Sequence, residues 1–232
     1  MKAKNLCIIP ARGGSKRIPR KNIKLFKGKP IIAYSIVAAI KSELFDEVMV
    51  STDDLEIAEI AQSFGASVPF MRSCQNSNDF ATTAEVLVEV IDTYKELGKE
   101  FTNICCIYPT APFINSHRLI EGFDMLTNGA DSVLTILSFD YPIWRSFKVN
   151  EKECLEYNWS EFINARSQDL PTAYHDAGQW YWVNCTMLKV TGNIIFDKTK
   201  GVILSPFEAH DIDTIDDWKL AELKYEYLQS IK

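Results

Sequence analysis

Five cations and two glycines are gathered in the run IPARGGSKRIPRKN, residues 9–22, which begins where the first apolar stretch of the chain ends. Glycine lets backbone N–H groups approach a phosphate closely, and lysine and arginine neutralise its charge. The spacing differs from the GxxxxGKS or GxxxxGKT loop and from the GxGxxG turn of dinucleotide oxidoreductases. A solvated basic loop is the alternative. We predict a polyphosphate-binding loop in which Arg12, Lys16 and Lys21 hold the phosphates.

A pair of carboxylates stands near the other end of the chain, in the motif DIDT. Side chains alternate in an extended segment, so Asp211 and Asp213 are expected on one face and Ile212 on the other. Two such carboxylates favour a hard cation such as Mg²⁺, which also takes oxygens from a substrate phosphate. Thr214 is expected to cap a final helix, with Asp217 as its capping partner. The alternative is that both aspartates serve only capping and solvation.

The basic run resembles the signature of the cytidylyltransferases that activate sialic-acid-like sugars. The resemblance continues through VSTDD (50–54), YPTAP (108–112), RSQDLP (166–171) and DIDT (211–214), in the same order. It implies that CMP passes from CTP to the anomeric hydroxyl of a nine-carbon 2-keto sugar acid, and that pyrophosphate leaves. It also implies Mg²⁺ on Asp211 and Asp213, with Mn²⁺ as its substitute, and catalytic roles for Arg12, Lys16 and Lys21.

The resemblance also implies which residues bind CTP. Small and hydroxyl residues beside backbone groups suit the narrow slot that a pyrimidine needs. A helix-capping loop, with Thr82 or Thr83 as the cap, is the alternative, and both interpretations can hold together. The implied CTP-binding residues are Ala11, Arg12, Gly13, Gly14, Ser15, Asn22, Arg72, Ala81, Thr82 and Thr83.

The sugar acid is expected to meet a different set of side chains. HDAGQWYW, residues 175–182, resembles the branch of the family that activates pseudaminic acid, and Tyr108 stands where the sialic-acid enzymes usually have glutamine. N-acetylneuraminate and legionaminic acid are the alternative acceptors, and a structural role is the alternative for His175. The expected sugar-binding residues are Tyr108, Arg166, Gln168, His175, Gln179 and Tyr181.

Apolar strand-like runs alternate with amphipathic helical stretches through most of the chain. This order predicts an α/β fold with a mainly parallel, Rossmann-like sheet of the nucleotide-diphospho-sugar transferase type, and such sheets bind ligands at the carboxyl ends of their strands. Pro30 is expected to open the first helix and Ser116 to cap the fourth. The expected strands are 6–9, 47–52, 103–108, 131–139 and 179–184, and the expected helices are 30–40, 54–64, 83–97, 116–128 and 215 onward.

Residues 140–176 interrupt this alternation with an aromatic-rich, aperiodic stretch. We expect an inserted lobe of antiparallel strands and loops within a single domain, 1–232. Exposed apolar surface of this kind marks an interface, so the lobe predicts a homodimer. Packing of the lobe back onto its own domain is the alternative. The family resemblance implies that such a lobe also brings Arg166 near the partner's site.

The composition narrows the function classes. The 232 residues are 47% hydrophobic, and the net charge is −6, which argues against nucleic-acid binding. No apolar run is long enough for a membrane span, and the six cysteines form no CxxC pair, so we expect a cytoplasmic protein. A non-catalytic nucleotide-sugar binding module remains an alternative, although it would have no need of paired carboxylates. The lack of a GxGxxG motif disfavours a Rossmann oxidoreductase.

Overall fold

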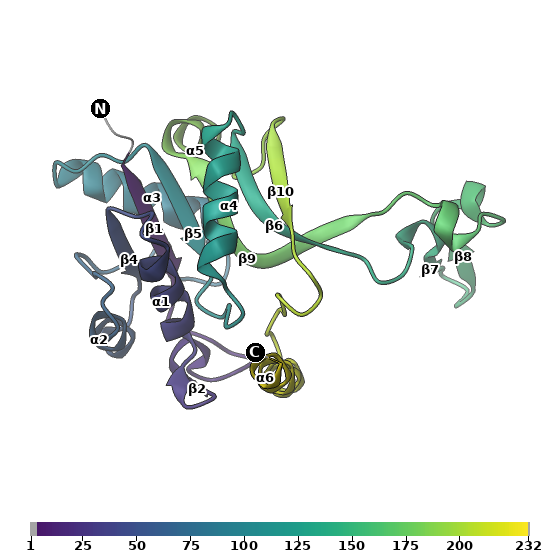
Figure 1. Ribbon diagram of the computed structural model, residues 1–232, viewed down its shortest axis with the longest axis horizontal. Helices are drawn as coiled ribbons and strands as arrows, with labels where there is room; N and C mark the ends of the chain where they lie inside the picture. The colour runs from purple at the N-terminus through teal and green to yellow at the C-terminus, as the bar shows by residue number, and fades with distance from the viewer. Residues whose placement is uncertain (1–3, 232) are drawn as a thin grey trace.

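A six-stranded sheet forms the centre of the computed structural model, which describes residues 4–231. The spatial order is β10-β6-β9-β5-β1-β4 (Figure 1). Only β9 runs antiparallel to its neighbours in this sheet, so the mainly parallel class expected from the sequence is confirmed. The strands are β1 (Asn5–Pro10), β4 (Glu47–Ser51), β5 (Asn103–Ile107), β6 (Ser132–Ser138), β9 (Tyr174–Asn184) and β10 (Thr199–Ile203).

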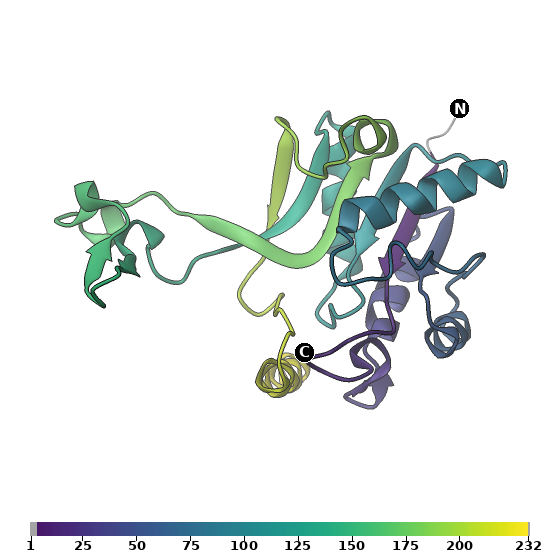
Figure 2. The same ribbon diagram turned by 180° about the vertical axis from the view of Figure 1, so that it is seen from behind.

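Helices cover both faces of the sheet. One face packs against α1 (Ile32–Ser42), α2 (Leu55–Ser63) and α4 (Ser116–Thr127) (Figure 1). The opposite face packs against α3 (Thr83–Glu96) and α5 (Cys185–Thr191), which lie in front in Figure 2. Because both faces are covered, the central strands are continuous apolar runs and not alternating ones. The β5 sequence NICCI, for example, is buried at every position.

Side-chain caps fix where two of these helices begin. The Asp54 carboxylate accepts a hydrogen bond from the N–H of Ile57 and caps α2. Thr82 and Glu85 form a reciprocal capping box at the start of α3. A cap of this kind stabilises a helix by about 1 kcal/mol. The Asp54 cap follows β4 directly, whereas the Thr82 cap ends the connection between α2 and α3.

The last helix, α6 (Ile215–Ser230), packs beside the N-terminal part of the chain. Phe26, in a small hairpin of β2 (Leu25–Phe26) and β3 (Lys29–Pro30), meets Trp218 and Tyr225 edge to face at 5.6 and 5.5 Å. Aromatic pairs in this arrangement contribute beyond their burial. Ile212 is fully buried in the same cluster, so the DIDT motif is anchored beside the basic loop.

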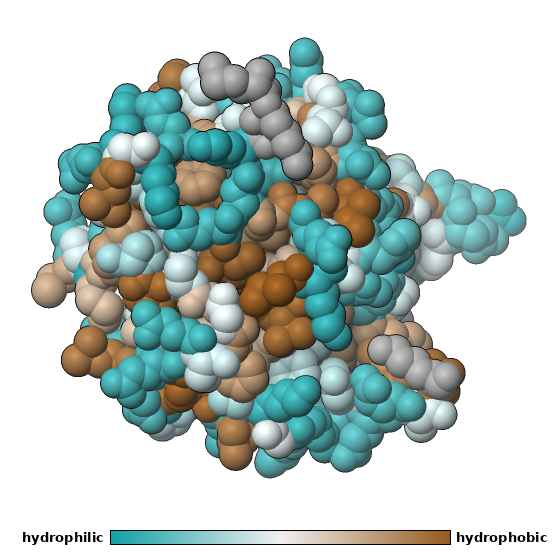
Figure 3. Space-filling model, turned by 60° about the vertical axis from the view of Figure 1, so that its left-hand side comes forward, coloured by the Kyte–Doolittle hydropathy of each residue, from teal (hydrophilic) through white to brown (hydrophobic). Residues whose placement is uncertain are grey.

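The inserted lobe leaves the sheet after β6 and returns as β9. It contains the antiparallel strands β7 (Phe147–Val149) and β8 (Leu155–Tyr157) and stands well away from the body (Figures 1 and 2). The space-filling view in Figure 3 likewise shows the lobe projecting beyond a rounded body. The strand β9 begins at Tyr174, earlier than the expected 179, so the lobe's return path is part of the central sheet.

Several local predictions were wrong. Pro30 pairs with Leu25 in β3, and the first helix begins only at Ile32. Asn115, not Ser116, caps α4, because its side chain accepts from the N–H of His117 at 2.9 Å. The helix α5, the strand β10 and the β2–β3 hairpin were not predicted from the sequence. Within residues 4–231, no helix is both long and apolar enough to span a membrane.

Candidate active site

A cavity of about 420 Å³ opens at the carboxyl ends of β1 and β5. This is the edge of a parallel sheet where ligands are expected to bind. Its wall is strongly cationic, because most of it comes from the basic loop. The lining residues are Pro10, Arg12, Ser15, Lys16, Arg17, Lys21, Asn22, Asp79, Tyr108, Pro109 and Thr110.

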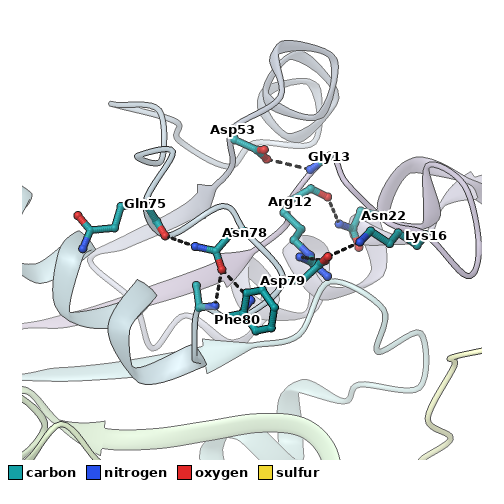
Figure 4. A network of polar contacts seen from close by, with 10 residues as sticks. Arg12, Gly13, Lys16, Asn22, Asp53, Gln75, Asn78, Asp79 and Phe80 are labelled. Atoms are coloured by element: carbon teal, nitrogen blue, oxygen red, sulfur yellow. Dashed lines mark hydrogen bonds and ion pairs between the residues drawn. The ribbon is translucent and has the colours of Figure 1, made fainter.

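The basic loop is held in shape by hydrogen bonds at its two ends. The side-chain amide of the buried Asn22 donates to the Arg12 carbonyl at 2.9 Å, and the Gly13 N–H donates to Asp53 at 2.8 Å (Figure 4). Arg20 binds the carboxylate of Asp54 through both of its terminal nitrogens. These contacts use Asn22, Asp53 and Arg20 to shape the loop, which leaves Arg12, Lys16 and Lys21 on the cavity wall.

One acidic residue that was not predicted from the sequence, Asp79, also lines the cavity. Asp79 accepts from Arg12 at 2.6 Å and forms an ion pair with Lys16 (Figure 4). These two cations hold the pKa of Asp79 below its ordinary value. The turn that presents it is local, since the Asn78 side chain accepts from the N–H groups of Phe80 and Ala81. Asp79 therefore stands where an anionic ligand of the two cations would bind.

The DIDT motif meets the basic loop through its second aspartate. Asp213 accepts from Arg17 at 2.8 Å and lies 3.5 Å from Lys21, whose ammonium group also donates to the Ile212 carbonyl at 2.7 Å. Asp211 is exposed and lines a second cavity of about 450 Å³ together with His175. The buried Ile212 between the two carboxylates keeps both of them at the surface.

Asp211 and Asp213 are of a residue type that could hold a cation shared with a nucleotide. Mg²⁺ takes oxygen ligands and is commonly held by one or two carboxylates plus phosphate oxygens. No three His, Cys, Asp or Glu side chains in the described part of the chain are grouped closely enough to hold a metal by themselves. Water molecules or phosphate oxygens would complete the coordination of any Mg²⁺ that Asp211 and Asp213 held.

Among the residues expected to bind CTP, four from the second half of the list lie outside the lining of the 420 Å³ cavity: Arg72, Ala81, Thr82 and Thr83. Arg72 is buried and donates to the Ser51 hydroxyl and carbonyl at the end of β4. Burial lowers its pKa, against the attraction of nearby carboxylates. Thr82 caps α3, as the alternative interpretation proposed, and the Thr83 hydroxyl lies 3.0 Å from the Tyr108 hydroxyl.

The expected sugar residues fall into three places. Tyr108 and Tyr181 pack edge to face at 5.4 Å beside the first cavity, and the Tyr181 hydroxyl donates to Asp176 at 2.7 Å. Burial raises the pKa of both phenols, so both stay protonated. Gln179 is almost fully buried, and its amide nitrogen donates to the Glu208 carbonyl. The amide nitrogen of Gln179 is thereby engaged by the protein itself.

The remaining sugar residues lie outside the first cavity. His175 is exposed on β9, lines the second cavity and packs against Phe139 with ring centroids 4.9 Å apart. Arg166 and Gln168 belong to the lobe, and Arg166 forms a two-point ion pair with Asp169 at 2.7 and 3.2 Å. Because the lobe stands away from the body (Figure 1), the chain does not bring these two residues to its own cavities.

The chain is similar to known cytidylyltransferases over most of its length. The family model for cytidylyltransferases matches residues 6–174. The chain is 41% identical to a pseudaminic acid cytidylyltransferase of Campylobacter jejuni subsp. jejuni, over 96% of both chains. It is 29% identical to a CMP-N,N'-diacetyllegionaminic acid synthase of Legionella pneumophila subsp. pneumophila, over 94% of both chains.

A solved structure shares the fold. It is that of a CMP:2-keto-3-deoxy-manno-octonic acid synthetase complexed with CTP, with a TM-score of 0.69 and 19% sequence identity. The alignment covers 98% of this chain and 100% of that one. At this level of identity the likeness concerns the arrangement of the sheet and helices, and it agrees with the mixed sheet described above.

Proposed function

Because the chain belongs to the cytidylyltransferase family of nucleotidyltransferases, we propose that it transfers CMP from CTP to the anomeric hydroxyl of pseudaminic acid and releases pyrophosphate. The observation that carries the proposal is the cationic cavity at the carboxyl ends of β1 and β5. The acceptor rests on the relative from Campylobacter jejuni, which is similar over nearly its whole length. The motif HDAGQWYW and Tyr108, which resemble the branch of the family that activates pseudaminic acid, also favour this acceptor.

The residues of the basic loop would carry the phosphate chemistry. Arg12 and Lys16 bind phosphate oxygens in place of Asp79, and Lys21 joins them from the DIDT side of the cavity. Charge-assisted bonds to phosphate are among the strong hydrogen bonds. They hold the α-phosphorus in line with the acceptor hydroxyl and stabilise the charge on the departing pyrophosphate, so the catalytic work is mainly positioning and electrostatics.

Asp211 and Asp213 would hold Mg²⁺, or Mn²⁺ in its place, together with oxygens of the bound nucleotide. The cation, when bound, supplies Lewis-acid polarisation of the phosphoryl group and screens its charge. Arg17 and Lys21 contact the Asp213 carboxylate, and these contacts hold that side chain against the basic loop. The two aspartates would thus join the cation to the cavity wall.

A side-by-side assay of pyrophosphate release tests the reaction and the acceptor together. The protein is supplied with CTP, Mg²⁺ and either pseudaminic acid, legionaminic acid or N-acetylneuraminate. We expect pseudaminic acid to be preferred at least about tenfold in kcat/KM, which corresponds to about 1.4 kcal/mol of transition-state binding. Preference for another sugar would overturn the acceptor assignment and leave the transfer reaction standing.

The metal assignment has its own variant and control. Asp213→Asn is expected to lower kcat by about two orders of magnitude, or roughly 3 kcal/mol of barrier. Asp216→Asn is the matched control, because Asp216 is an exposed carboxylate on the first turn of α6 and pairs with the exposed Lys219. Near-normal turnover of Asp213→Asn at ordinary Mg²⁺ concentrations would remove this residue from the metal site.

The lobe would make the protein a homodimer. Tyr141 is 85% exposed, and Phe147, Val149 and Leu155 also present apolar surface to solvent. Patches of this kind mark interfaces, and a dimer would carry Arg166 and Gln168 toward the partner's sugar site. Light scattering at micromolar concentration tests this, and a monomeric mass would contradict it.

All six cysteines are free thiols, which supports a reducing compartment such as the cytoplasm.

A further inference from the structure

The segment that carries the metal-binding aspartates has neither helix nor strand. It comprises residues 205–213, between β10 and α6, and we refer to it as the carboxylate segment. Fixing the backbone of a residue in an irregular segment costs about 1–2 kcal/mol of conformational entropy. A segment of this kind keeps a defined position only where side chains from packed elements bind it.

Arg118 provides the most extensive of these contacts, from the first turns of α4. Its guanidinium binds Glu208 at two points, Nε to Oε1 at 2.9 Å and Nη2 to Oε2 at 3.1 Å. Glu208 also accepts from the Ser205 N–H at 2.9 Å, and this bond closes the first turn of the segment. Arg118 and Glu208 are 29% and 27% exposed, so water screens the pair only partly.

Contacts from three other elements hold the backbone of the same segment. Gln179, on β9, donates to the Glu208 carbonyl. Lys224, on α6, donates to the carbonyls of Pro206 and Ala209 at 2.6 and 2.8 Å. Lys21, in the basic loop, donates to the Ile212 carbonyl at 2.7 Å. Residues of α4, β9, α6 and the basic loop therefore all bind the carboxylate segment.

Arg118 and Glu208 line neither of the two cavities. They can influence a reaction only through the segment that they hold, and Glu208 lies three residues before Asp211. Hydrogen bonds from Arg118 lower the pKa of Glu208, and those from Glu208 raise the pKa of Arg118, so both remain charged at neutral pH. A bidentate arginine–carboxylate pair fixes orientation as well as distance.

We propose that the Arg118–Glu208 pair is a positioning clamp, which sets the place of Asp211 and Asp213 relative to the basic loop. The role as a metal-positioning device rests on the proposed function. Since neither residue lines one of the two cavities, the pair would act through the segment and not by contact with substrate or metal. Loss of the clamp leaves the aspartates present but displaced, so it weakens the use of Mg²⁺ far more than the binding of CTP to the basic loop.

Two variants test the clamp. Glu208→Gln keeps the shape of the side chain and removes its charge, and Arg118→Lys keeps the charge and removes the two-point geometry. In each we expect kcat to fall about tenfold, KM for CTP to stay within about twofold, and the half-saturating Mg²⁺ concentration to rise about fivefold or more. Amide hydrogen exchange in residues 205–213 should become faster.

Glu47→Gln is the matched control. Glu47 is also a largely buried glutamate in an ion pair, with Lys99 at 2.8 Å, but it lies at the amino-terminal start of β4, away from the cavity. Glu47→Gln should lower the melting temperature without moving the Mg²⁺ dependence. The clamp is overturned if Glu208→Gln and Arg118→Lys behave in the same way as this control.

Hydrogen exchange separates the clamp from the reaction. If the wild-type protein releases no pyrophosphate with any of the three sugars, the proposed function fails, and the exchange experiment still decides whether the pair holds the segment. Unchanged exchange in residues 205–213 of Glu208→Gln would overturn the clamp even in a protein that is fully active. Faster exchange confined to this segment would support it.

Discussion

Gly13 is the position in the basic loop where one added methyl group should have the largest effect. A Cβ atom built there would lie 2.7 Å from Oδ2 of Asp54 and 3.1 Å from its Cβ. The Asp54 side chain cannot simply turn away, because it caps α2 through the Ile57 N–H and is bound by Arg20. Gly13→Ala must therefore move the loop, break the cap, or do both.

The size of the effect follows from these contacts. Loss of the cap costs about 1 kcal/mol, and displacement of a carboxylate from its arginine adds a similar amount, so we expect unfolding to become easier by about 1–2 kcal/mol. The Gly13 N–H also holds Asp53 at 2.8 Å, so Arg12 next to it shifts as well. A shift of this kind should lower kcat/KM for CTP about tenfold or more.

Gly14 supplies the control for this experiment. Nothing lies within 4 Å of a Cβ built at Gly14, so Gly14→Ala should change the free energy of unfolding by no more than about 0.5 kcal/mol. Urea denaturation and steady-state kinetics on the two variants make the comparison. Equal denaturation midpoints for Gly13→Ala and Gly14→Ala would refute the reasoning, because only one of them meets a fixed carboxylate.

Three further predictions concern charge, packing and pH. Asp79→Asn removes the negative charge that competes with phosphate for the two loop cations, so KM for CTP should fall about two- to fivefold in steady-state assays; a rise would mean that Asp79 helps to bind the nucleotide. Gly122→Ala would place a Cβ against Cη2 of the fully buried Trp180 ring and 2.7 Å from its Cζ3, so chemical denaturation should show a loss of about 1–3 kcal/mol, with KM for CTP unchanged. Hydrogen bonds from Arg20 lower the pKa of Asp54 in the folded state. The ionised Asp54 therefore contributes its full stabilisation above the ordinary carboxyl pKa, and this stabilisation is lost as the pH falls through the lowered pKa. Asp54→Asn should therefore make the unfolding free energy less dependent on pH below about pH 4, and an unchanged acid dependence would contradict the assignment.

The sequence predicted the elements whose signals are local. Apolar runs identified β1, β4, β5 and β6. Thr214 caps α6 as expected, and Thr82, one of the two threonines expected there, caps α3. Such signals depend on neighbours along the chain, which a sequence displays directly. The direction of β9 was not predictable in this way, because its pairing with β5 and β6 joins residues that are far apart in the chain.

The same limit applies to the site. The basic loop and DIDT could be recognised in the sequence as separate motifs. The ion pair of Asp79 with Arg12 and that of Arg118 with Glu208 could not, because each joins residues that are far apart in the chain. Arg72 shows the opposite case. The family resemblance implies that it contacts CTP, and the fold adds that its buried guanidinium donates to Ser51 at the end of β4. A residue's type indicates what it can bind, and only packing determines what it does bind.

The lobe begins and ends at a single pair of neighbouring strands. Ser138 pairs with Tyr174, and the Phe139 N–H donates to the Ala173 carbonyl at 3.0 Å, so the whole lobe replaces what would be the turn of a β6–β9 hairpin. Each doubling of a loop costs about 0.6 kcal/mol of closure entropy, so a connection about three doublings longer than a tight turn costs only about 2 kcal/mol. The lobe is therefore an exchangeable module: a short turn could replace it, or another lobe could be grafted there, without rethreading the sheet that carries the cavity.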